Sequence, residues 1–536
     1  MDLEAVWQQV ARFQESYVVT SGSIAPSSHE QVLVREFLQQ VPVAALFACL
    51  QDASDRYDDK QVKQICSCID RVLGADGNDG VFFHPDMLPF ILAGLSHVEK
   101  RARVLTVNQL ATHLSRNPTP AQVAVMAIPE VIQALCDVVA DEDSEVAARA
   151  TRVLETFSRF EEGAFFKPVL DLLKAKSQSS EVTMNSVEFM RYLESIARIC
   201  EQNESRMEYA INNNAAQLVE LGRLICIQNV HQILDCLKSD DPLFLMNVVD
   251  LVPSLSKTRL GIQHIFQSGT LQTLLGMAED PFVGGSAIRL VGEMSATAAK
   301  LNVKSWNWDD PVLSKAFLDT IESKIQSTDS LQQIAAMDAL AAFGSSSDKE
   351  LHLLLQHKSL CQSWLQLGAS TKMEVKANCF HSLGRIIGEP TRLTRALEDI
   401  PADNAGIWVL HERLFNSLGR ECRNQSTLMY LMEILRQPFE EIRSAVFVLL
   451  RAVAAQNNEW GMSALLSYGG FFEFLMDRTT EPTKETREWK FAIADAVMVS
   501  PFHSKLDAVT LEKMQAYLRK GPYVGVAPPS MDLDAA

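Results

Sequence analysis

Hydrophobic positions recur along this chain with the period of an α-helix. From Asp143 to Phe160, apolar residues follow the first one after four, seven, eight and eleven positions, so they lie on one helical stripe. Three later segments repeat this pattern. The four stripes are Val146, Ala150, Val153, Leu154 and Phe157; Phe189, Leu193, Ile196, Ala197 and Cys200; Val375, Cys379, Leu383 and Ile386; and Ile442, Ala445, Val446, Leu449, Leu450 and Val453. They predict amphipathic helices that each bury one face.

The segments are spaced as in a helical repeat protein. The first apolar residue after each acidic or proline-containing corner serves as a marker. The markers are Val146, Val187, Leu243, Val283, Leu331, Val375 and Ile442, with steps of 41, 56, 40, 48, 44 and 67 residues. Four of these six steps lie at or close to the roughly 40–47 residues of armadillo and HEAT units. We therefore predict an all-α fold, an armadillo/HEAT-like right-handed α-solenoid with degenerate repeats over residues 1–520. A generic helical bundle is the alternative.

Corner residues predict where helices begin. Proline disfavours helix in the preceding residue and fits the first helical turn, which predicts helix starts at three corners. These corners are Asp241-Pro242, Asp280-Pro281 and Gln437-Pro438. N-caps or first-turn groups are expected at Asp143, Asp329 and Thr483. The runs IFQSGTLQTLL and LLSYGGFFEFL each break at glycine before an apolar helix, as a third armadillo helix would.

A few segments interrupt the helical pattern. TSGSIAPSSHE, from Thr20, reads as a linker after an N-terminal helix, and GADGNDG, from Gly74, reads as a loop. The stretch 388–406 is the insertion behind the 67-residue step, and 521–536 is predicted to be a disordered tail. The N-terminal helix carries the stripe Val6, Val10, Phe13 and Tyr17.

Composition narrows the functional classes. The 536 residues carry 49 Lys and Arg against 67 Asp and Glu, a formal net charge of -18, which disfavours nucleic acid and anionic membrane surfaces as partners. The start, MDLEAVWQQVARF, lacks the basic and apolar regions of a signal peptide, and 10 Cys are too sparse for a disulfide framework. Cys66 and Cys68, the close pair, are about 200° apart on a helix. We expect a protein of the cytoplasm, with the nucleus as a second compartment.

Catalytic signals are absent from the sequence. It contains no GxxxxGK[ST], GxGxxG after a strand, HExxH or GxSxG motif. His381 lies beside a core stripe, and His411-Glu412 lies on a face that reads as exposed. In GADGNDG the spacing of Asp76 and Asn78 is wrong for a calcium loop, and Met87 stands where the bidentate Glu belongs. We predict that the chain is not an enzyme and holds no metal or cofactor.

Two groups of residues are candidates for a functional role, and for each a purely structural role is the alternative. Acidic pairs, Glu161-Glu162 and Glu440-Glu441, sit at predicted helix starts, where the helix dipole explains them. Trp306 and Trp308 are candidates either for partner anchors or for plugs of an inter-helix corner, and the corner is favoured. The same two alternatives hold for Trp460, Phe471 and Phe472.

The C-terminal segments resemble a known family. QPFEEIRSAVFVLLRAVAAQ from Gln437, SYGGFFEFLMDRT from Ser467, KETREWKFAIADAV from Lys484 and AYLRKGPYVGV from Ala516 resemble the proteasome non-ATPase regulatory subunit 5 family of armadillo/HEAT-like proteins. The resemblance is best over 437–526. Upstream of this range it is one of architecture only.

The resemblance implies a function. Members of that family are assembly chaperones for the base of the proteasome regulatory particle. They hold the C-terminal domain of an AAA ATPase subunit and are absent from the finished proteasome. The matching residues Phe439, Phe471, Asp477, Arg478 and Tyr523 are implied to set corners and the end cap, and the motif identifies no partner-binding residue. Another armadillo-type adaptor, such as a transport or phosphatase scaffold, is the alternative. An enzyme with an unrecognised site is a third hypothesis.

Overall fold

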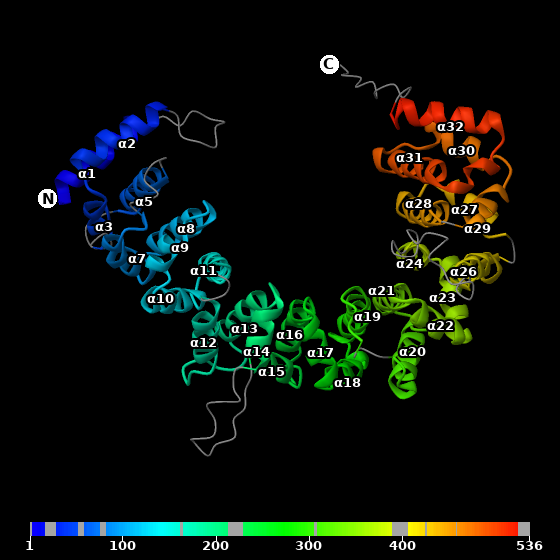
Figure 1. Cartoon of the computed structure of the whole chain (residues 1–536), viewed down its shortest axis with the longest axis horizontal. Coiled ribbons are helices and arrows are strands. Elements are labelled where there is room, and N and C mark those ends of the chain that lie inside the picture. Colours follow the sequence, from blue (N-terminus) through cyan, green and yellow to red (C-terminus); the bar gives the residue numbers. More distant parts are fainter. Residues whose placement is uncertain are drawn as a thin grey trace, which may run out of the picture. The chain divides into compact units, whose positions relative to one another are not determined.

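The computed structural model describes residues 3–16, 28–51, 58–74, 82–160, 165–212, 229–304, 308–388, 406–423, 426–456 and 458–523. These residues form α-helices, short 3-10 helices and turns, and no strand occurs among them (Figure 1). The chain divides into two compact units, an N-terminal unit, Met1–Gly261, and a C-terminal unit, Ile262–Ala536. Each unit is described separately.

The N-terminal unit is built from helices joined by short corners. Its α-helices are α1 (Leu3–Ser16), α2 (Ser28–Gln40), α3 (Val43–Gln51), α5 (Asp59–Gly74), α7 (Leu88–Leu95), α8 (Lys100–Ser115), α9 (Pro120–Met126), α10 (Pro129–Val139), α11 (Ser144–Phe157), α12 (Phe166–Ser177), α13 (Val187–Cys200), α14 (Glu204–Asn212), α15 (Asn229–Cys236) and α16 (Pro242–Leu255). The 3-10 helix η1 (Pro85–Met87) precedes α7, and α17 (Arg259–Gln267) contains the boundary between the units.

The C-terminal unit continues this construction. Its α-helices are α18 (Thr270–Gly276), α19 (Gly284–Lys300), α20 (Pro311–Ile325), α21 (Ser330–Ser346), α22 (Asp348–Gln356), α23 (Lys358–Gln366), α24 (Met373–Ile387), α26 (Gly406–Arg423), α27 (Thr427–Leu435), α28 (Glu440–Ala454), α29 (Glu459–Leu466), α30 (Phe471–Met476), α31 (Lys484–Val499) and α32 (Ala508–Lys520). The 3-10 helices are η3 (Met277–Glu279), η4 (Leu367–Ala369), η7 (Arg478–Thr480) and η8 (Pro501–Lys505).

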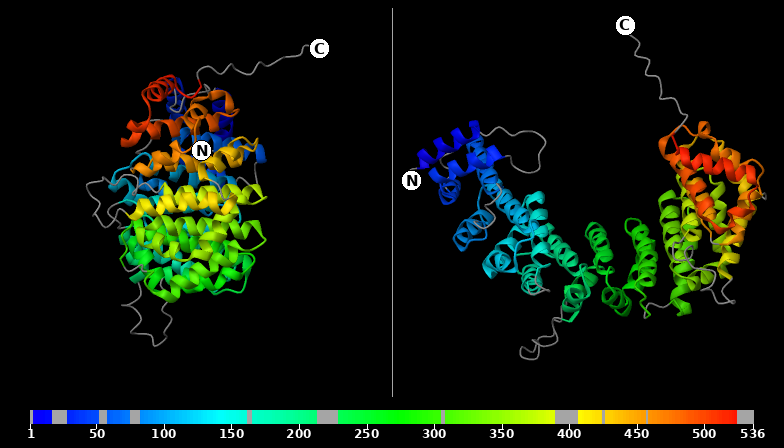
Figure 2. Two further views of the ribbon diagram at one scale, coloured as in Figure 1. Left: turned by 90° about the vertical axis from the view of Figure 1, so that its right-hand side faces the viewer. Right: turned by 45° about the horizontal axis from the view of Figure 1, so that its top comes forward.

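Each unit contains a row of long helices in which every member packs against the next (Figure 2). We call α5, α8, α11, α13 and α16 the N-terminal row, and α19, α21, α24, α28 and α31 the C-terminal row. A second layer backs each row: α7, α10, α12 and α14 pack in series in the first unit, and α20, α23, α26 and α29 in the second. Such stacking of helical units is the construction of an α-solenoid, which confirms the predicted fold class.

The helices of each row run parallel. Between α11 and α13, Thr151 contacts Ser195 and Glu155 contacts Arg198. Residue numbers therefore increase in the same direction along both helices. The same holds for α19 and α21, since a Cβ on Gly285 would lie 3.4 Å from Ala335 Cβ and one on Gly292 would lie 2.5 Å from the Ala339 carbonyl oxygen. Parallel packing brings the N-terminal ends of a row to one edge.

The predicted stripes form the core. All twenty stripe residues named for the four segments are buried, as are Val6, Val10 and Phe13, while Tyr17 lies outside the described residues. The markers Val187, Leu243 and Leu331 are themselves 61%, 73% and 76% exposed, so they mark helix starts and not core positions. They lie in the first turn of their helices.

Most predicted helix starts are confirmed. Asp143, Asp329 and Thr483 are N-caps whose side chains accept backbone N–H bonds, and Asp241 caps α16 with Pro242 in its first turn. Gly269 and Gly470 precede α18 and α30 with φ of 76° and 90°, values that favour glycine.

Two proline corners differ from the prediction. The Asp280 carboxylate accepts from the N–H groups of Phe282 and Val283 at 2.8 and 3.0 Å, forming a turn that delays α19 to Gly284. At the second corner α28 begins at Glu440, with Phe439 as N-cap, so Pro438 lies outside the helix.

Several predictions fall wholly or partly on residues outside the described ranges. Residues 20–27 of the predicted linker are not described. Ser28, His29 and Glu30 belong to α2, so the prediction that the linker extends to Glu30 is wrong. Asp76, Asn78, Glu161-Glu162 and Trp306 are not described, nor are 389–405 and 524–536. The single solenoid over 1–520 stays a prediction.

The aromatic candidates in the described ranges are structural. Trp308 is 1% exposed, donates from Nε1 to Ser295 Oγ at 2.9 Å and stacks on Phe317. Three others, Trp460, Phe471 and Phe472, are also buried. Their corner-filling interpretation is therefore confirmed.

The C-terminal end is held by Arg478. Its guanidinium donates to the carbonyl oxygens of Gly521 at 2.6 Å and Tyr517 at 3.0 Å, and lies 4.1 Å from the centre of the Tyr517 ring. The Tyr523 hydroxyl donates to Glu488. The predicted tail therefore begins with three residues, 521–523, that contact the last helices.

The other family-matched residues occupy corners. Asp477 caps η7 by accepting from the Thr479 N–H, and Phe471 is the buried first residue of α30. Phe439 stands at a corner with its ring 42% exposed, so its side chain does little packing there.

Candidate functional site

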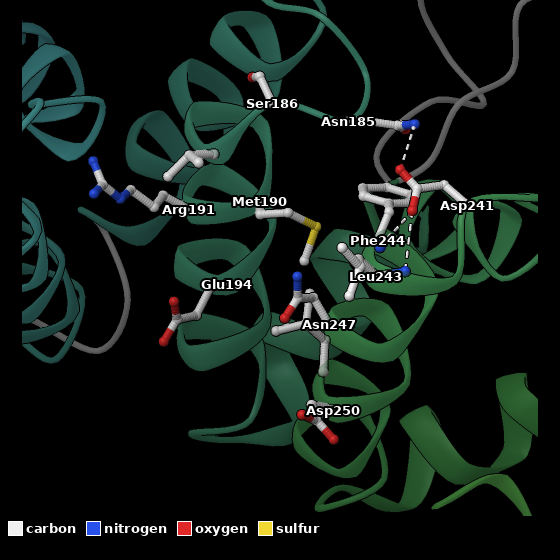
Figure 3. A pocket seen from close by; sticks show the side chains of 12 residues that line it. Asn185, Ser186, Met190, Arg191, Glu194, Asp241, Leu243, Phe244, Asn247 and Asp250 are labelled. Atoms are coloured by element: carbon white, nitrogen blue, oxygen red, sulfur yellow. Dashed lines mark hydrogen bonds between the residues drawn. The ribbon is translucent and has the colours of Figure 1, made fainter. Parts of the chain in front are cut away.

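A groove between α13 and α16 is the candidate functional site (Figure 3). It encloses about 550 Å³ within the N-terminal unit. Its lining residues are Asn185, Ser186, Val187, Met190, Arg191, Glu194, Asp241, Leu243, Phe244, Asn247, Asp250 and Leu251. Exposed apolar side chains and carboxylates thus share one concave surface.

The apolar part of the groove results from the composition of α16. Its sequence, PLFLMNVVDLVPSL, contains one charged residue. Phe244, Val248 and Val252 are buried in the core, whereas Leu243 is 73% exposed and Met246 is 42% exposed. Apolar residues therefore remain on the outward face of this helix, beside Val187 and Met190 of α13.

The N-terminal mouth of the groove is fixed by capping. Asp241 Oδ1 accepts from the backbone N–H groups of Leu243 at 3.0 Å and Phe244 at 3.3 Å. Its Oδ2 accepts from Asn185 Nδ2 at 3.4 Å, which joins the corners before the two helices. Beneath them, the rings of Phe189 and Phe244 lie 6.1 Å apart. These contacts keep the walls in register.

The charged residues of the groove differ in the partners that they contact. Arg191 points away from the cavity, as Figure 3 shows, and donates to the carbonyl oxygen of Asp141. Glu194 pairs with Arg198 at 2.7 Å, and this carboxylate raises the pKa of the Arg198 guanidinium. Asp250 is exposed at the far end of the groove. The four charged lining residues, Arg191, Glu194, Asp241 and Asp250, sum to -2.

A smaller cavity of about 220 Å³ lies on the other side of α13, against α11. It shares Arg191 and Glu194 with the groove and adds Arg152 and Arg198. The surface of α13 therefore separates an apolar and acidic groove from a more basic one.

The sequence pattern does not indicate this groove. Leu243 and Val187 mark helix starts in the sequence, and the single charge of α16 signals a helix with apolar residues on more than one face. His411 was placed on an exposed face but is buried, with Nδ1 3.1 Å from Gln456 Oε1. His381 and Glu412 are exposed.

The described residues show no arrangement for metal chemistry. Over the described ranges, no group of three or more His, Cys, Asp or Glu side chains could hold a metal ion. Cys66 and Cys68 are both buried, because α5 packs against α1, α3 and α8, and burial raises the pKa of each thiol to about 12. The prediction places these two cysteines on opposite sides of the helix, and in the structure neither side chain is exposed.

The length and apolar content of the helices bear on whether any of them could cross a bilayer. In the part of the chain that the structure describes, no single helix is long and apolar enough to cross a membrane. Two bent helix pairs satisfy length and composition alone, Gln31–Gln40 with Val43–Leu50 and Pro120–Met126 with Pro129–Val139.

The fold and groove define a class, the all-α repeat scaffold with a surface groove between its helices. Within that class, the chain belongs to the family described as proteasome non-ATPase 26S subunit, whose model matches residues 23–534. This confirms the resemblance inferred from the C-terminal motifs.

Named relatives agree with this assignment. The 26S proteasome non-ATPase regulatory subunit 5 of Homo sapiens is 21% identical over 443 residues, covering 80% of this chain and 79% of the relative. The subunit of the same name from Drosophila melanogaster is 21% identical over 531 residues, covering 95% and 92%. The role of the protein is thus related to the proteasome.

Solved structures similar to the chain include engineered repeat proteins. One engineered protein covers 85% of this chain and 99% of its own length at 15% identity and a TM-score of 0.40. A designed armadillo repeat protein in complex with the peptide (KR)4 covers 50% of this chain and 98% of its own, at 14% identity and a TM-score of 0.35.

Proposed function

We propose that this protein is a chaperone for assembly of the base of the proteasome regulatory particle. It binds the C-terminal domain of an AAA ATPase subunit and is absent from the mature proteasome. Family membership supports the proteasomal role. The observation that carries the binding role is the α13–α16 groove, which is lined by exposed Leu243 and half-buried Met190 together with Glu194 and Asp250.

The groove suits a folded or extended protein segment that presents apolar and basic side chains. Burial of a leucine-sized side chain contributes about 1.5–3 kcal/mol, whereas an exposed ion pair contributes about 0–1 kcal/mol. Apolar contact therefore supplies most of the affinity, and the carboxylates accelerate association at low salt. The proposal includes no catalysis, cofactor, nucleic acid or membrane partner, and places the protein in the cytoplasm, with the nucleus as a second compartment.

Occupation of the ATPase C-terminal domain has a consequence for assembly. The extreme tail of that domain docks onto the proteolytic core. A solenoid bound beside it would exclude the core by its bulk. Chaperone binding and core engagement are therefore expected to compete.

A binding assay with isolated ATPase C-terminal domains tests the proposal. We expect one domain to bind the full-length protein and to be released when proteolytic core particle is added. Leu243→Ser and Asp250→Lys, both at exposed positions, should weaken binding about tenfold or more, since tenfold corresponds to about 1.4 kcal/mol.

Matched variants on the same unit serve as controls. Val98 is 88% exposed and the Asp86 side chain 89% exposed, and neither lies in the groove. Val98→Ser and Asp86→Lys should bind normally. The chaperone assignment is overturned if no ATPase domain binds, or if the protein stays on assembled proteasomes. Co-purification with nuclear cargo or a phosphatase catalytic subunit would instead support the adaptor.

A further inference from the structure

Four exposed apolar side chains occur at the N-terminal ends of four successive helices of the C-terminal row. Phe282 precedes α19, Leu331 is in the first turn of α21, Met373 begins α24 and Phe439 caps α28. Their exposed fractions are 65%, 76%, 41% and 42%. Large apolar residues exposed in a repeated position differ from the scattered single residues of an ordinary surface and indicate an interaction site.

These four residues share one edge of the unit because the helices are parallel. At that edge Lys372 Nζ, before α24, donates to the Thr328 carbonyl oxygen, before α21, at 2.5 Å. Further along the row, Ser444 Oγ donates to Glu485 Oε1 at 2.8 Å, which joins the first turns of α28 and α31. We call Phe282, Leu331, Met373 and Phe439 the apolar edge.

The apolar edge has an acidic surround. Within two residues in sequence of its four members lie the carboxylates of Asp280, Asp329, Glu374, Glu440 and Glu441, against one cation, Lys372. These charges sum to -4. Asp280 accepts backbone N–H bonds in the turn before α19, Asp329 accepts one as the N-cap of α21, and Glu440 and Glu441 are exposed. A partner therefore needs basic groups between its apolar ones.

Helix spacing specifies the partner further. Packed helices lie about 8–10 Å apart, so neighbouring members of the apolar edge recur at about this interval. A polyproline II segment repeats one face every three residues, or about 9 Å. An amphipathic helix would instead present a continuous apolar stripe, whereas here each apolar residue has a carboxylate within two residues in sequence.

We propose that the apolar edge binds an extended partner segment that carries an apolar residue at every third position and Lys or Arg between them. This surface belongs to the C-terminal unit and does not depend on the α13–α16 groove. The proposal therefore stands apart from the proposed chaperone function.

A synthetic peptide of four Leu-Pro-Lys repeats is a suitable probe. It has the required period, and proline holds it in the extended conformation. Fluorescence anisotropy with the full-length protein should show binding that weakens as salt rises. A peptide of the same composition with its leucines contiguous, and an amphipathic helical peptide whose leucines recur alternately after three and four residues, should each bind at least about tenfold more weakly.

Substitutions locate the peptide on the protein. Leu331→Ser and Phe282→Ser change exposed side chains and should each weaken binding about tenfold. Val312→Ser, at a residue that is 75% exposed at the start of α20 in the other layer, is the matched control and should leave binding unchanged. Equal loss in all three variants overturns the proposal.

Further outcomes also decide the matter. Failure of the peptide to bind, equal binding of the contiguous-leucine or the helical peptide, or an effect of Leu331→Ser on self-association instead of peptide binding each overturn it. Leu243→Ser and Asp250→Lys should retain peptide binding while losing the ATPase domain. Failure of one proposal is thereby distinguished from failure of the other.

Discussion

The two rows of parallel helices differ in how closely the backbones of successive helices approach. In the N-terminal row, charged and polar side chains connect successive helices. In the C-terminal row such bridges also occur, as between Arg289 and Asp338, and small residues in addition bring helix backbones into direct contact. Both arrangements form a solenoid from amphipathic helices. A substitution in the N-terminal row can remove a polar bridge, whereas one in the C-terminal row can disturb the fit between two backbones.

Polar bridges recur along the N-terminal row. Arg101 of α8 pairs with Asp59 of α5, and Gln109 Nε2 donates to Asp70 Oδ1 at 2.7 Å. Thr151 and Ser195 join α11 to α13 through hydroxyls 3.0 Å apart. Side chains thereby set the distance between neighbouring helices, and the groove between α13 and α16 occupies part of the space that remains.

Close approach distinguishes the C-terminal row. A Cβ on Gly292 would lie 2.5 Å from the Ala339 carbonyl oxygen, and one on Gly384 would lie 3.3 Å from Leu449 Cα. The exposed pair of Arg385 and Glu293, at 2.7 Å, joins α24 to α19 across the intervening α21. The buried residues of α21 include five alanines and Gly344, and these small side chains permit that bridge.

The largest effect is expected from a charge placed inside the C-terminal row. Val446 of α28 is 0% exposed, so Val446→Asp buries an unpaired carboxylate and should cost about 4 kcal/mol or more. Limited proteolysis should release C-terminal pieces and leave a helical N-terminal fragment, because each repeat contacts only its neighbours.

The control for that substitution is Val499→Asp at the end of α31, where the side chain is 77% exposed. It should cost less than about 1 kcal/mol. Loss of the entire chain in one step with Val446→Asp would contradict local stabilisation.

The second effect concerns a charge that the C-terminal row already buries. Lys490 of α31 is 1% exposed, and desolvation lowers the pKa of its amine from 10.5 to about 8, against the opposing influence of Glu481. The unfolded chain therefore holds this proton up to about pH 10.5, while the folded chain releases it near pH 8. Stability should rise by up to about 3 kcal/mol as pH rises through this interval.

Comparison with Lys490→Met isolates that contribution, since thiols and tyrosines also titrate at alkaline pH. Urea unfolding of both proteins at pH 7.5 and 10 should show a stability difference that changes with pH. A constant difference would mean that Lys490 keeps its proton throughout.

The sequence predicts the buried stripes well, because a helical period forces one face into the core. It does not predict the exposure of Leu243 or Phe439, since residues in the first turn can lie outside the packed interface. Nor does it place His411, whose partner Gln456 lies just after α28, 45 residues further along the chain. The groove depends on side chains of two helices whose markers are 56 residues apart, so local periodicity cannot indicate it.

The close approach of α19 and α21 predicts a third effect. Gly292→Ala forces a Cβ against the Ala339 backbone and should cost about 2 kcal/mol. Gly285→Ala on the same helix is the matched control, because its Cβ would meet Ala335 Cβ at an ordinary 3.4 Å. That change should be neutral or stabilising by up to about 1 kcal/mol. Hydrogen exchange in α19 and α21 measures both, and equal effects would contradict backbone contact as the cause.

The smallest effect is expected in the N-terminal row, where a polar bridge can be weakened without a steric change. Asp141 accepts from Arg103 Nε at 2.6 Å and from the Asp143 N–H at 2.9 Å, and its side chain is 6% exposed. Asp141→Asn retains the shape and removes the charge, so it should cost about 1–2 kcal/mol.

Asp137→Asn breaks a more exposed pair with Lys176, where the carboxylate side chain is 52% exposed, and should cost less than about 1 kcal/mol. Hydrogen exchange in α8 and α11 should separate the two variants, and added salt should reduce the Asp137 effect more, since exposed charges are screened more strongly. If Asp141→Asn changes exchange no more than Asp137→Asn, polar bridges do not stabilise the N-terminal row, and its apolar stripes alone would account for its packing.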